Sequence, residues 1–126
     1  MRVMFDTNAY DAILTAGDEE RIAATIAAGA VTLVTTPVQE DEIRQIRNRA
    51  RREALLGLLR RLGGTRVDPA TVIADDITYM SRDEILARVA QACCDRLVTG
   101  DRALAAATPL AASYADFARD VLKRDA

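Results

Sequence analysis

Histidine is absent from this chain of 126 residues, and tryptophan is absent as well. Without histidine the chain cannot form a Ser-His-Asp or Cys-His catalytic arrangement, a His-ligated zinc site or an imidazole acid–base pair. Aromatic residues make up only 4% of the chain, which is too few for a surface that stacks several nucleic-acid bases. Any catalysis must therefore depend on carboxylates, hydroxyl groups, thiols, cationic side chains or a bound metal ion.

Cysteines and long apolar runs are also scarce. The two cysteines, Cys93 and Cys94, are adjacent, a spacing that fits neither a zinc site nor a disulfide framework. No apolar run reaches the roughly 20 residues that a transmembrane helix needs, and the first residues do not follow a signal-peptide pattern. We therefore expect a cytoplasmic protein that does not enter a membrane.

Half of the residues are hydrophobic, 29% are charged and the formal net charge is −2, a composition typical of one globular domain covering residues 1–126. Short aliphatic runs alternate with helical patterns. The predicted strands are residues 2–5, 31–35, 65–67, 96–99 and 110–112. Because the runs rich in Val, Leu and Ile are apolar on both faces, the pattern predicts an α/β protein, a three-layer α/β/α sandwich around a central parallel sheet of four to five strands.

Helix boundaries can be predicted from capping residues. Residues 36–39 supply a threonine N-cap, a proline at the first helical position and a glutamine three residues after the cap, and residues 81–84 form a second capping box. The longest helical pattern covers residues 38–62. It predicts either one long helix or a helical hairpin that breaks near Asn48.

Four carboxylates follow the predicted strands or begin the helices behind them. Asp6 follows the first strand, Glu42 lies one turn into the helix after the second, Asp83 lies in the first turn of a later helix, and Asp101 follows the strand at 96–99. Because ligands of parallel sheets bind outside the carboxyl ends of the strands, we expect these acids to gather at one edge. Their mutual repulsion is usually relieved by a divalent cation.

Oxygen ligands without histidine or cysteine favour Mg²⁺ or Mn²⁺ over zinc. Such a site supports metal-assisted attack of water on a phosphodiester bond. Each acid also has a purely structural interpretation at this stage. Asp6 and Asp101 could belong to a turn or a helix N-cap, Asp83 could be an acid at a helix start, and Glu42 could be a solvated helix residue.

These segments, in this order, resemble those of PIN domains. Met4-Phe5-Asp6-Thr7-Asn8 resembles the end of the first strand in that family. The segments similar to those that carry the later acids and the last strand-to-helix junction are residues 36–43, 83–90, 97–101 and 113–117. The resemblance covers nearly the whole chain, apart from residues 68–80. It implies a parallel sheet flanked by helices and a metal-dependent ribonuclease.

The resemblance also implies roles for individual residues. Asp6, Glu42, Asp83 and Asp101 would surround one or two Mg²⁺ or Mn²⁺ ions, and hydrogen bonds from the polar neighbours Thr7, Asn8 and Thr99 would orient ligands or water. Glu40, Asp41, Asp76 and Glu84 are alternatives for individual ligands, and the position of Glu42 is the one most open to such a replacement.

Stand-alone PIN domains of this size resemble the toxin half of VapBC toxin–antitoxin pairs. The resemblance therefore implies an endoribonuclease that cleaves RNA, a cognate antitoxin protein that silences it, and a homodimer. The alternative is a PIN-like binding module that has lost turnover and acts through RNA or protein partners. A P-loop nucleotide hydrolase is excluded, because the sequence has no GxxxxGK[ST] motif.

Arginines are concentrated between residues 44 and 61. Arg44, Arg47 and Arg51 are predicted to share a helical face at i, i+3 and i+7, next to Glu42. Such a basic strip would bind an RNA backbone or an acidic segment of an antitoxin. The other interpretation is a solvated helix face whose charge is balanced by the acids at 40–42.

Overall fold

The computed structural model describes residues 1–123, which form five strands and eight helices. In chain order these are β1 (Arg2–Phe5), α1 (Thr7–Ala16), α2 (Glu19–Ala27), β2 (Thr32–Thr35), α3 (Pro37–Arg44), α4 (Arg49–Leu62), β3 (Thr65–Arg66), α5 (Pro69–Val72), α6 (Arg82–Cys93), β4 (Arg96–Val98), α7 (Arg102–Ala107), β5 (Ala111–Ala112) and α8 (Tyr114–Val121). Each predicted strand is confirmed to within one residue at either end.

The strands form one sheet in the order β3-β2-β1-β4-β5, and every pairing is parallel. The chain builds the sheet outward from β1 in one direction through β2 and β3, and then in the other direction through β4 and β5. The junction of β1 and β4 is therefore the switch point of the sheet, the place where open α/β sheets bind ligands. The predicted α/β class with an all-parallel sheet is confirmed.

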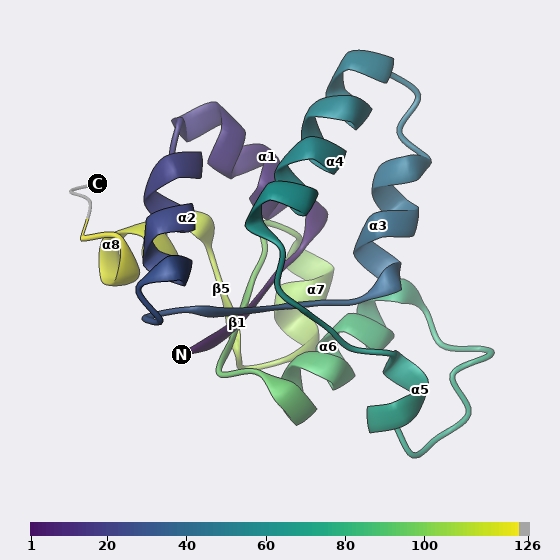
Figure 1. The fold of residues 1–126 in the computed structure, drawn as a ribbon. Coiled ribbons are helices and arrows are strands. Elements are labelled where there is room, and N and C mark those ends of the chain that lie inside the picture. Colours follow the sequence, from purple (N-terminus) through teal and green to yellow (C-terminus); the bar gives the residue numbers. More distant parts are fainter. Residues whose placement is uncertain (124–126) are drawn as a thin grey trace.

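Helices cover both faces of this sheet. Val3, Phe5 and Leu33 point to the face that packs on α1, α2 and α4, whereas Met4 and Leu97 point to the face that packs on α6. In Figure 1, α2 and α4 lie above the strands, and α5 and α6 lie below them. The strands β1, β2 and β4 are thus buried on both faces, which explains why their sequences are apolar without alternation, whereas the edge strand β3 is exposed.

The helical pattern over residues 38–62 is a hairpin. Helix α3 ends at Arg44, and the side chain of Asn48 accepts the N–H of Arg51 at 3.0 Å as the N-cap of α4. The prediction that Arg44, Arg47 and Arg51 share one helical face is therefore wrong. Arg44 ends α3, Arg47 lies in the connection, and Arg51 lies in α4, where it forms an ion pair with Asp11 of α1.

The predicted helix caps are present. The Thr36 side chain accepts the N–H of Val38 and forms a complete capping box with Gln39, and the Ser81 hydroxyl accepts the N–H of Glu84 at the start of α6. These caps set where α3 and α6 begin, and hence where Glu42 and Asp83 lie. None of the helices in residues 1–123 combines the length and the apolar character needed to cross a bilayer.

Candidate active site

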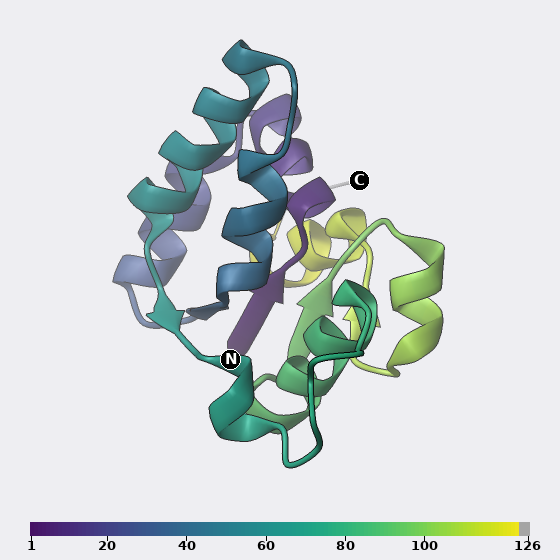
Figure 2. The ribbon, with the colours of Figure 1, turned by 90° about the vertical axis from the view of Figure 1, so that its right-hand side faces the viewer.

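Asp6 lies at the switch point, directly after β1. Figure 2 shows the arrowheads of β1 (purple) and β4 (green) pointing the same way, so the residues that follow them lie at one edge of the sheet. The Asp6 side chain is only 7% exposed. One carboxylate oxygen, Oδ1, accepts the N–H of Thr7 at 2.8 Å, so Asp6 is the N-cap of α1. The other oxygen, Oδ2, accepts the Thr99 hydroxyl at 3.0 Å and the Asn8 side-chain amide at 3.3 Å.

The same hydrogen bonds connect the ends of β1 and β4. The Thr99 hydroxyl, which donates to Asp6, accepts the N–H of Asp101 at 3.0 Å. The Asn8 side-chain oxygen accepts the N–H of Gly100 at 2.8 Å. Thr99 and Asn8 therefore hold the carboxylate of Asp6 in one orientation and fix the backbone that carries Asp101.

Thr7, the neighbour of Asp6, has a buried hydroxyl that makes no hydrogen bond to any residue in the described range 1–123. Buried polar groups in proteins are rarely left without a partner. Thr7 contacts Asp6 through its backbone N–H and not through this hydroxyl.

Asp101 begins α7 after β4, and Asp83 comes from α6, which packs on the face of the sheet opposite α1. Oδ1 of Asp101 accepts the N–H groups of Ala103 and Leu104, at 2.8 and 3.2 Å, so the N-cap interpretation of Asp101 is confirmed. Asp83 lies half-buried in the first turn of α6. Its carboxylate has no hydrogen bond or ion pair with another described residue, so the local structure of α6 leaves it without a partner.

The four carboxylates act on one another electrostatically. Burial raises the pKa of Asp6, hydrogen bonds from Thr7 and Thr99 oppose this, and the charges of Glu42 and Asp101 raise the pKa further. Burial, then the charges of Asp101 and Glu42, raise the pKa of Asp83. Each of the four acids thus interacts with two of the others, although they come from four separate segments of the chain. We refer to Asp6, Glu42, Asp83 and Asp101 as the acidic cluster.

Among the acids of α3, it is Glu42 that belongs to this cluster. Glu40 forms ion pairs with Arg44 at 2.8 Å and Arg66 at 2.7 Å, and hydrogen bonds from these two arginines lower the pKa of Glu40. Glu42 instead faces α6, where its Oε2 lies 3.4 Å from Nη1 of Arg82. Among the acids of α3, Glu42 is the one whose charge raises the pKa values of Asp6 and Asp83, together with the charge of Asp101.

The other alternative acids have local partners or lie exposed. The side chain of Asp76 accepts the N–H and the hydroxyl of Thr78, and Glu84 accepts the Ser81 hydroxyl at the start of α6. Asp41 is exposed on α3. Neither Asp76 nor Glu84 is among the charges that shift the pKa values of Asp6 and Asp83.

Arg82 is a residue that the sequence analysis missed. It is the first residue of α6, and its guanidinium reaches α3, where Nη1 pairs with Glu42 and Nη2 donates to Oε1 of Gln45 at 2.8 Å. Arg82 therefore places a positive charge at the edge of the acidic cluster and offsets part of its negative charge. The only signal in the sequence was its position next to Asp83.

The donor chemistry of the acidic cluster fits a divalent cation, since every donor is a carboxylate oxygen and the charges destabilise one another. As they stand, however, no three Asp, Glu or Cys side chains within residues 1–123 are grouped so that they could hold a metal ion. The four acids are thus close enough to influence one another's pKa values, but their side chains are not arranged as the ligands of one metal ion. Glu42 and Asp83 are only half-buried, so their side chains have room to move.

Replacing Asp83 with asparagine should stabilise the metal-free protein at neutral pH. A raised pKa means that the folded state binds the proton more tightly than the unfolded chain, so the stability linked to Asp83 is present in acid and is lost as the pH rises above the ordinary pKa of 3.8. In thermal melts with a chelator, Asp83→Asn should melt above the wild type at about pH 7 and level with it at about pH 3.5.

A variant that melts below the wild type at neutral pH would contradict this expectation. It would mean that the attraction between the Asp83 carboxylate and the N-terminus of α6 exceeds the cost of burial and of the neighbouring charges. Glu84→Gln, in the same helical turn but exposed, is the matched control for that helix-dipole effect.

In comparisons with known proteins, no family model matches the chain, and no curated protein and no solved structure is significantly similar to it. The PIN resemblance therefore stays a prediction that depends on the motifs. The α/β/α architecture and the placement of the four acids depend on the structure alone.

Proposed function

We propose that the chain is a divalent-metal-dependent endoribonuclease of the PIN type that hydrolyses RNA phosphodiester bonds. The observation that supports this most is the acidic cluster at the switch point of the sheet. Helix capping accounts for one oxygen of Asp6 and one of Asp101, but it does not account for Asp83 or for the side of Asp6 that faces β4. A site in which neighbouring carboxylates raise one another's pKa values is typical of catalytic centres.

Mg²⁺ or Mn²⁺ held by Asp6, Glu42, Asp83 and Asp101 would supply an activated water and a clamp for the scissile phosphate. In this arrangement Asp6 is the fixed member, because three hydrogen bonds hold its carboxylate. Asp83 is the member without local partners among the described residues, and Glu42 is tied to Arg82 only through a contact of 3.4 Å. The Arg82 guanidinium, next to these acids, suits contact with a phosphate oxygen.

The finer part of the proposal is a biological role as the toxin of a VapBC pair. It depends on the PIN resemblance, and it includes a cognate antitoxin, a homodimer and a cytoplasmic location in which the free thiols of Cys93 and Cys94 stay reduced. A neighbouring reading frame for a small DNA-binding antitoxin would support this role. Growth arrest on expression of the chain alone, absent for Asp83→Asn, would support it further.

Metal dependence is the direct test of the nuclease. We expect the purified chain to cleave RNA with millimolar Mg²⁺ or Mn²⁺, to stop when a chelator is added, and to recover when excess metal is restored, because water attack at this site needs the cation. The readout is the appearance of RNA fragments on a denaturing gel. Asp83→Asn, purified in parallel, controls for contaminating ribonuclease.

Binding of the cation is measured separately from cleavage. The wild-type melting temperature should rise with Mn²⁺ concentration, since a ligand that binds only the folded state stabilises it. Cleavage that persists in chelator would contradict the carboxylate mechanism. If there is neither cleavage nor binding of Mg²⁺ or Mn²⁺ at millimolar concentration, the chain is the PIN-like binding module without turnover.

A further inference from the structure

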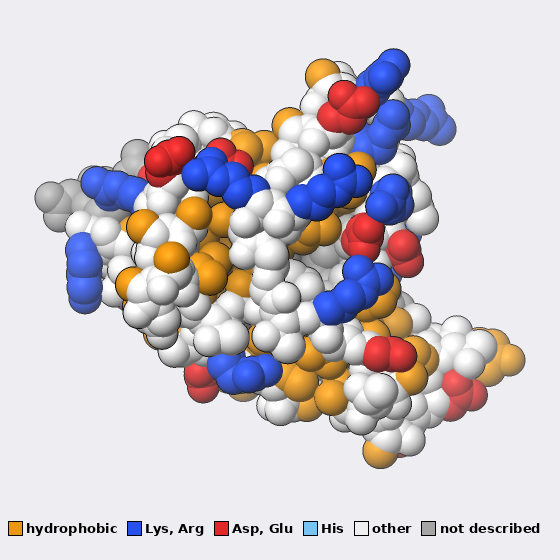
Figure 3. Space-filling view, viewed as in Figure 1, with side chains coloured by type: hydrophobic (Ala, Val, Ile, Leu, Met, Phe, Trp, Pro, Cys, Tyr) orange, Lys and Arg blue, Asp and Glu red, His pale blue; other side chains and the backbone are white. Residues whose placement is uncertain are grey.

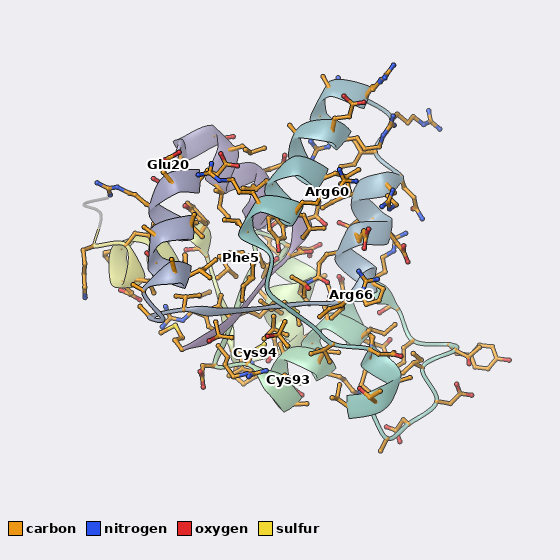
Figure 4. All side chains as sticks on the ribbon, in the orientation of Figure 1. Phe5, Glu20, Arg60, Arg66, Cys93 and Cys94 are labelled. Carbon is orange, nitrogen blue, oxygen red and sulfur yellow. The ribbon has the colours of Figure 1, made fainter. Side chains whose placement is uncertain are left out.

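A cavity of about 260 Å³ opens between the start of α3 and the end of α4, separate from the acidic cluster. Its lining includes Thr36, Glu40, Leu59, Arg60, Gly64 and Arg66. Figure 4 labels Arg60 on α4 and Arg66 at the end of β3, on opposite sides of this opening. Figure 3, in the same orientation, shows cationic side chains around a hollow with apolar atoms inside.

Positive charge exceeds negative charge around this cavity. Glu40 is the one carboxylate in its lining among the described residues, and it is shared by Arg66 and Arg44. The side chain of Arg60 is exposed and forms no ion pair within residues 1–123. Guanidinium groups bind phosphate oxygens through a planar set of donors, so the cavity is suited to an anion of the phosphate type.

The cavity and the acidic cluster lie at the same edge of the sheet. Thr36 follows β2 and Arg66 ends β3, while Asp6 follows β1, and all these strands are parallel. Helix α3 separates the two places. Glu40 and Glu42 are two residues apart on this helix, about 200° around its axis, so Glu40 reaches the cavity and Glu42 reaches the acidic cluster.

The turn before β3 is part of the cavity lining and packs closely on β2. Gly64 has φ +118°, and a Cβ at this position would lie 2.7 Å from the carbonyl oxygen of Leu33. Only glycine lets the chain pass this close to β2. This turn joins the last turn of α4, which carries Arg60, to β3, which ends at Arg66, and both arginines line the cavity.

We propose that this cavity is a phosphate subsite that holds a backbone phosphate of the RNA strand away from the scissile bond, with Arg60 and Arg66 as its contacts. This inference depends on the proposed function, because it takes RNA as the substrate. At about 260 Å³ the cavity is smaller than the roughly 300–1,000 Å³ pockets that enclose drug-sized ligands, and it suits a phosphate group with part of its sugar.

The test is the affinity for a fluorescein-labelled single-stranded RNA oligonucleotide, measured by fluorescence anisotropy in chelator over a range of salt concentrations. Arg60→Gln and Arg66→Gln should each bind RNA about fivefold more weakly at low salt. The negative slope of the logarithm of the association constant against the logarithm of the salt concentration should become shallower by roughly 0.7. Glu40→Gln should bind about two- to threefold more tightly, because it removes the carboxylate that pairs with Arg44 and Arg66.

Arg49→Gln is the matched control. Arg49 is an exposed arginine at the opposite end of α4, paired with Glu53, and its replacement should leave the affinity for RNA close to that of the wild type. Unchanged affinity and salt slope for both Arg60→Gln and Arg66→Gln, with melting temperatures close to that of the wild type, would overturn the phosphate subsite. A loss of affinity for a polyglutamate peptide without a loss for RNA would overturn it too, in favour of an acidic protein segment.

The two proposals fail in different ways. Weaker RNA binding by Arg60→Gln in a chain that never cleaves RNA supports the subsite and refutes the nuclease. Metal-dependent cleavage with unchanged RNA affinity in Arg60→Gln and Arg66→Gln supports the nuclease and refutes the subsite. Wild-type protein that binds no RNA in this assay refutes the subsite, while metal-dependent cleavage is still judged by the gel.

Discussion

Asp83→Asn is expected to lower kcat/KM for metal-dependent RNA cleavage by at least about 100-fold. Asn has nearly the same size as Asp but no negative charge, so it keeps the helix start and weakens the hold on a divalent cation. Asp83 is the most informative acid to change, because its carboxylate bonds to no other described residue and its loss breaks no contact of the fold. The measurement is the initial rate of cleavage of a defined RNA at several substrate concentrations.

Asp6→Asn should lose activity to a similar extent, but this loss combines the effect of a missing metal ligand with that of disrupted hydrogen bonds. The Asp6 carboxylate accepts hydrogen bonds from Thr7, Asn8 and Thr99, and an asparagine amide cannot accept all of them. The melting temperature of this variant must therefore be measured beside its activity.

Glu84→Gln is the matched control for Asp83→Asn. Glu84 is an acid in the same turn of α6, but it is exposed and bonds to Ser81. It should keep at least about half of the wild-type activity, as expected of a surface substitution. If Asp83→Asn stays active, or if Glu84→Gln is the inactive variant, Asp83 is not a ligand of the catalytic cation.

Phe5→Ala is expected to cost about 3–5 kcal/mol in the free energy of unfolding, a large share of the total for a domain of this size. Phe5 is fully buried, and its ring packs edge-to-face on Tyr10 and Phe117, with centroid distances of 5.5 and 5.3 Å. Truncation removes this aromatic packing and leaves a cavity beneath the end of β1. The measurement is urea denaturation of the metal-free protein.

Phe5→Leu is the companion variant, because it keeps most of the apolar volume and should lose clearly less stability. Phe5 directly precedes Asp6, and its carbonyl oxygen accepts the Gln39 side-chain amide at 3.3 Å. A folded fraction of Phe5→Ala should therefore also show weaker cleavage. A loss below about 1 kcal/mol for Phe5→Ala would mean that the aromatic contacts add little to the stability of the core.

The elements and their caps could be predicted because the signals are local. The central strands β1, β2 and β4 contain short aliphatic runs, and Thr36, Asn48 and Ser81 each cap a helix through the backbone of residues two or three positions away. The prediction of a basic strip was wrong because α3 ends at Arg44 and a new helix begins after Asn48, so the three arginines do not share one helix. The sequence of residues 38–62 is compatible with one long helix or with a hairpin that breaks near Asn48. The packing of α3 against α4 shows that the hairpin forms.

The candidate site was harder to predict from the sequence, because its residues come from separate segments of the chain. That Asp6 and Asp101 follow strands was visible in the sequence, but the choice of Glu42 over Glu40 was not. It depends on Arg66, from β3, pairing with Glu40, and on Arg82, from α6, pairing with Glu42. No pattern within α3 carries that information.

The amino-acid sequence by itself determined the α/β class, the parallel sheet implied by buried strands, the starts of α3 and α6, and the absence of histidine chemistry. Those properties follow from composition and from contacts between residues a few positions apart. Only the tertiary structure decided which acids influence one another, which arginines they pair with, and that Arg60 and Arg66 border one cavity. Electrostatic energies depend on distance in space and on burial, and both are set when β1 and β4 pair and the helices pack around them.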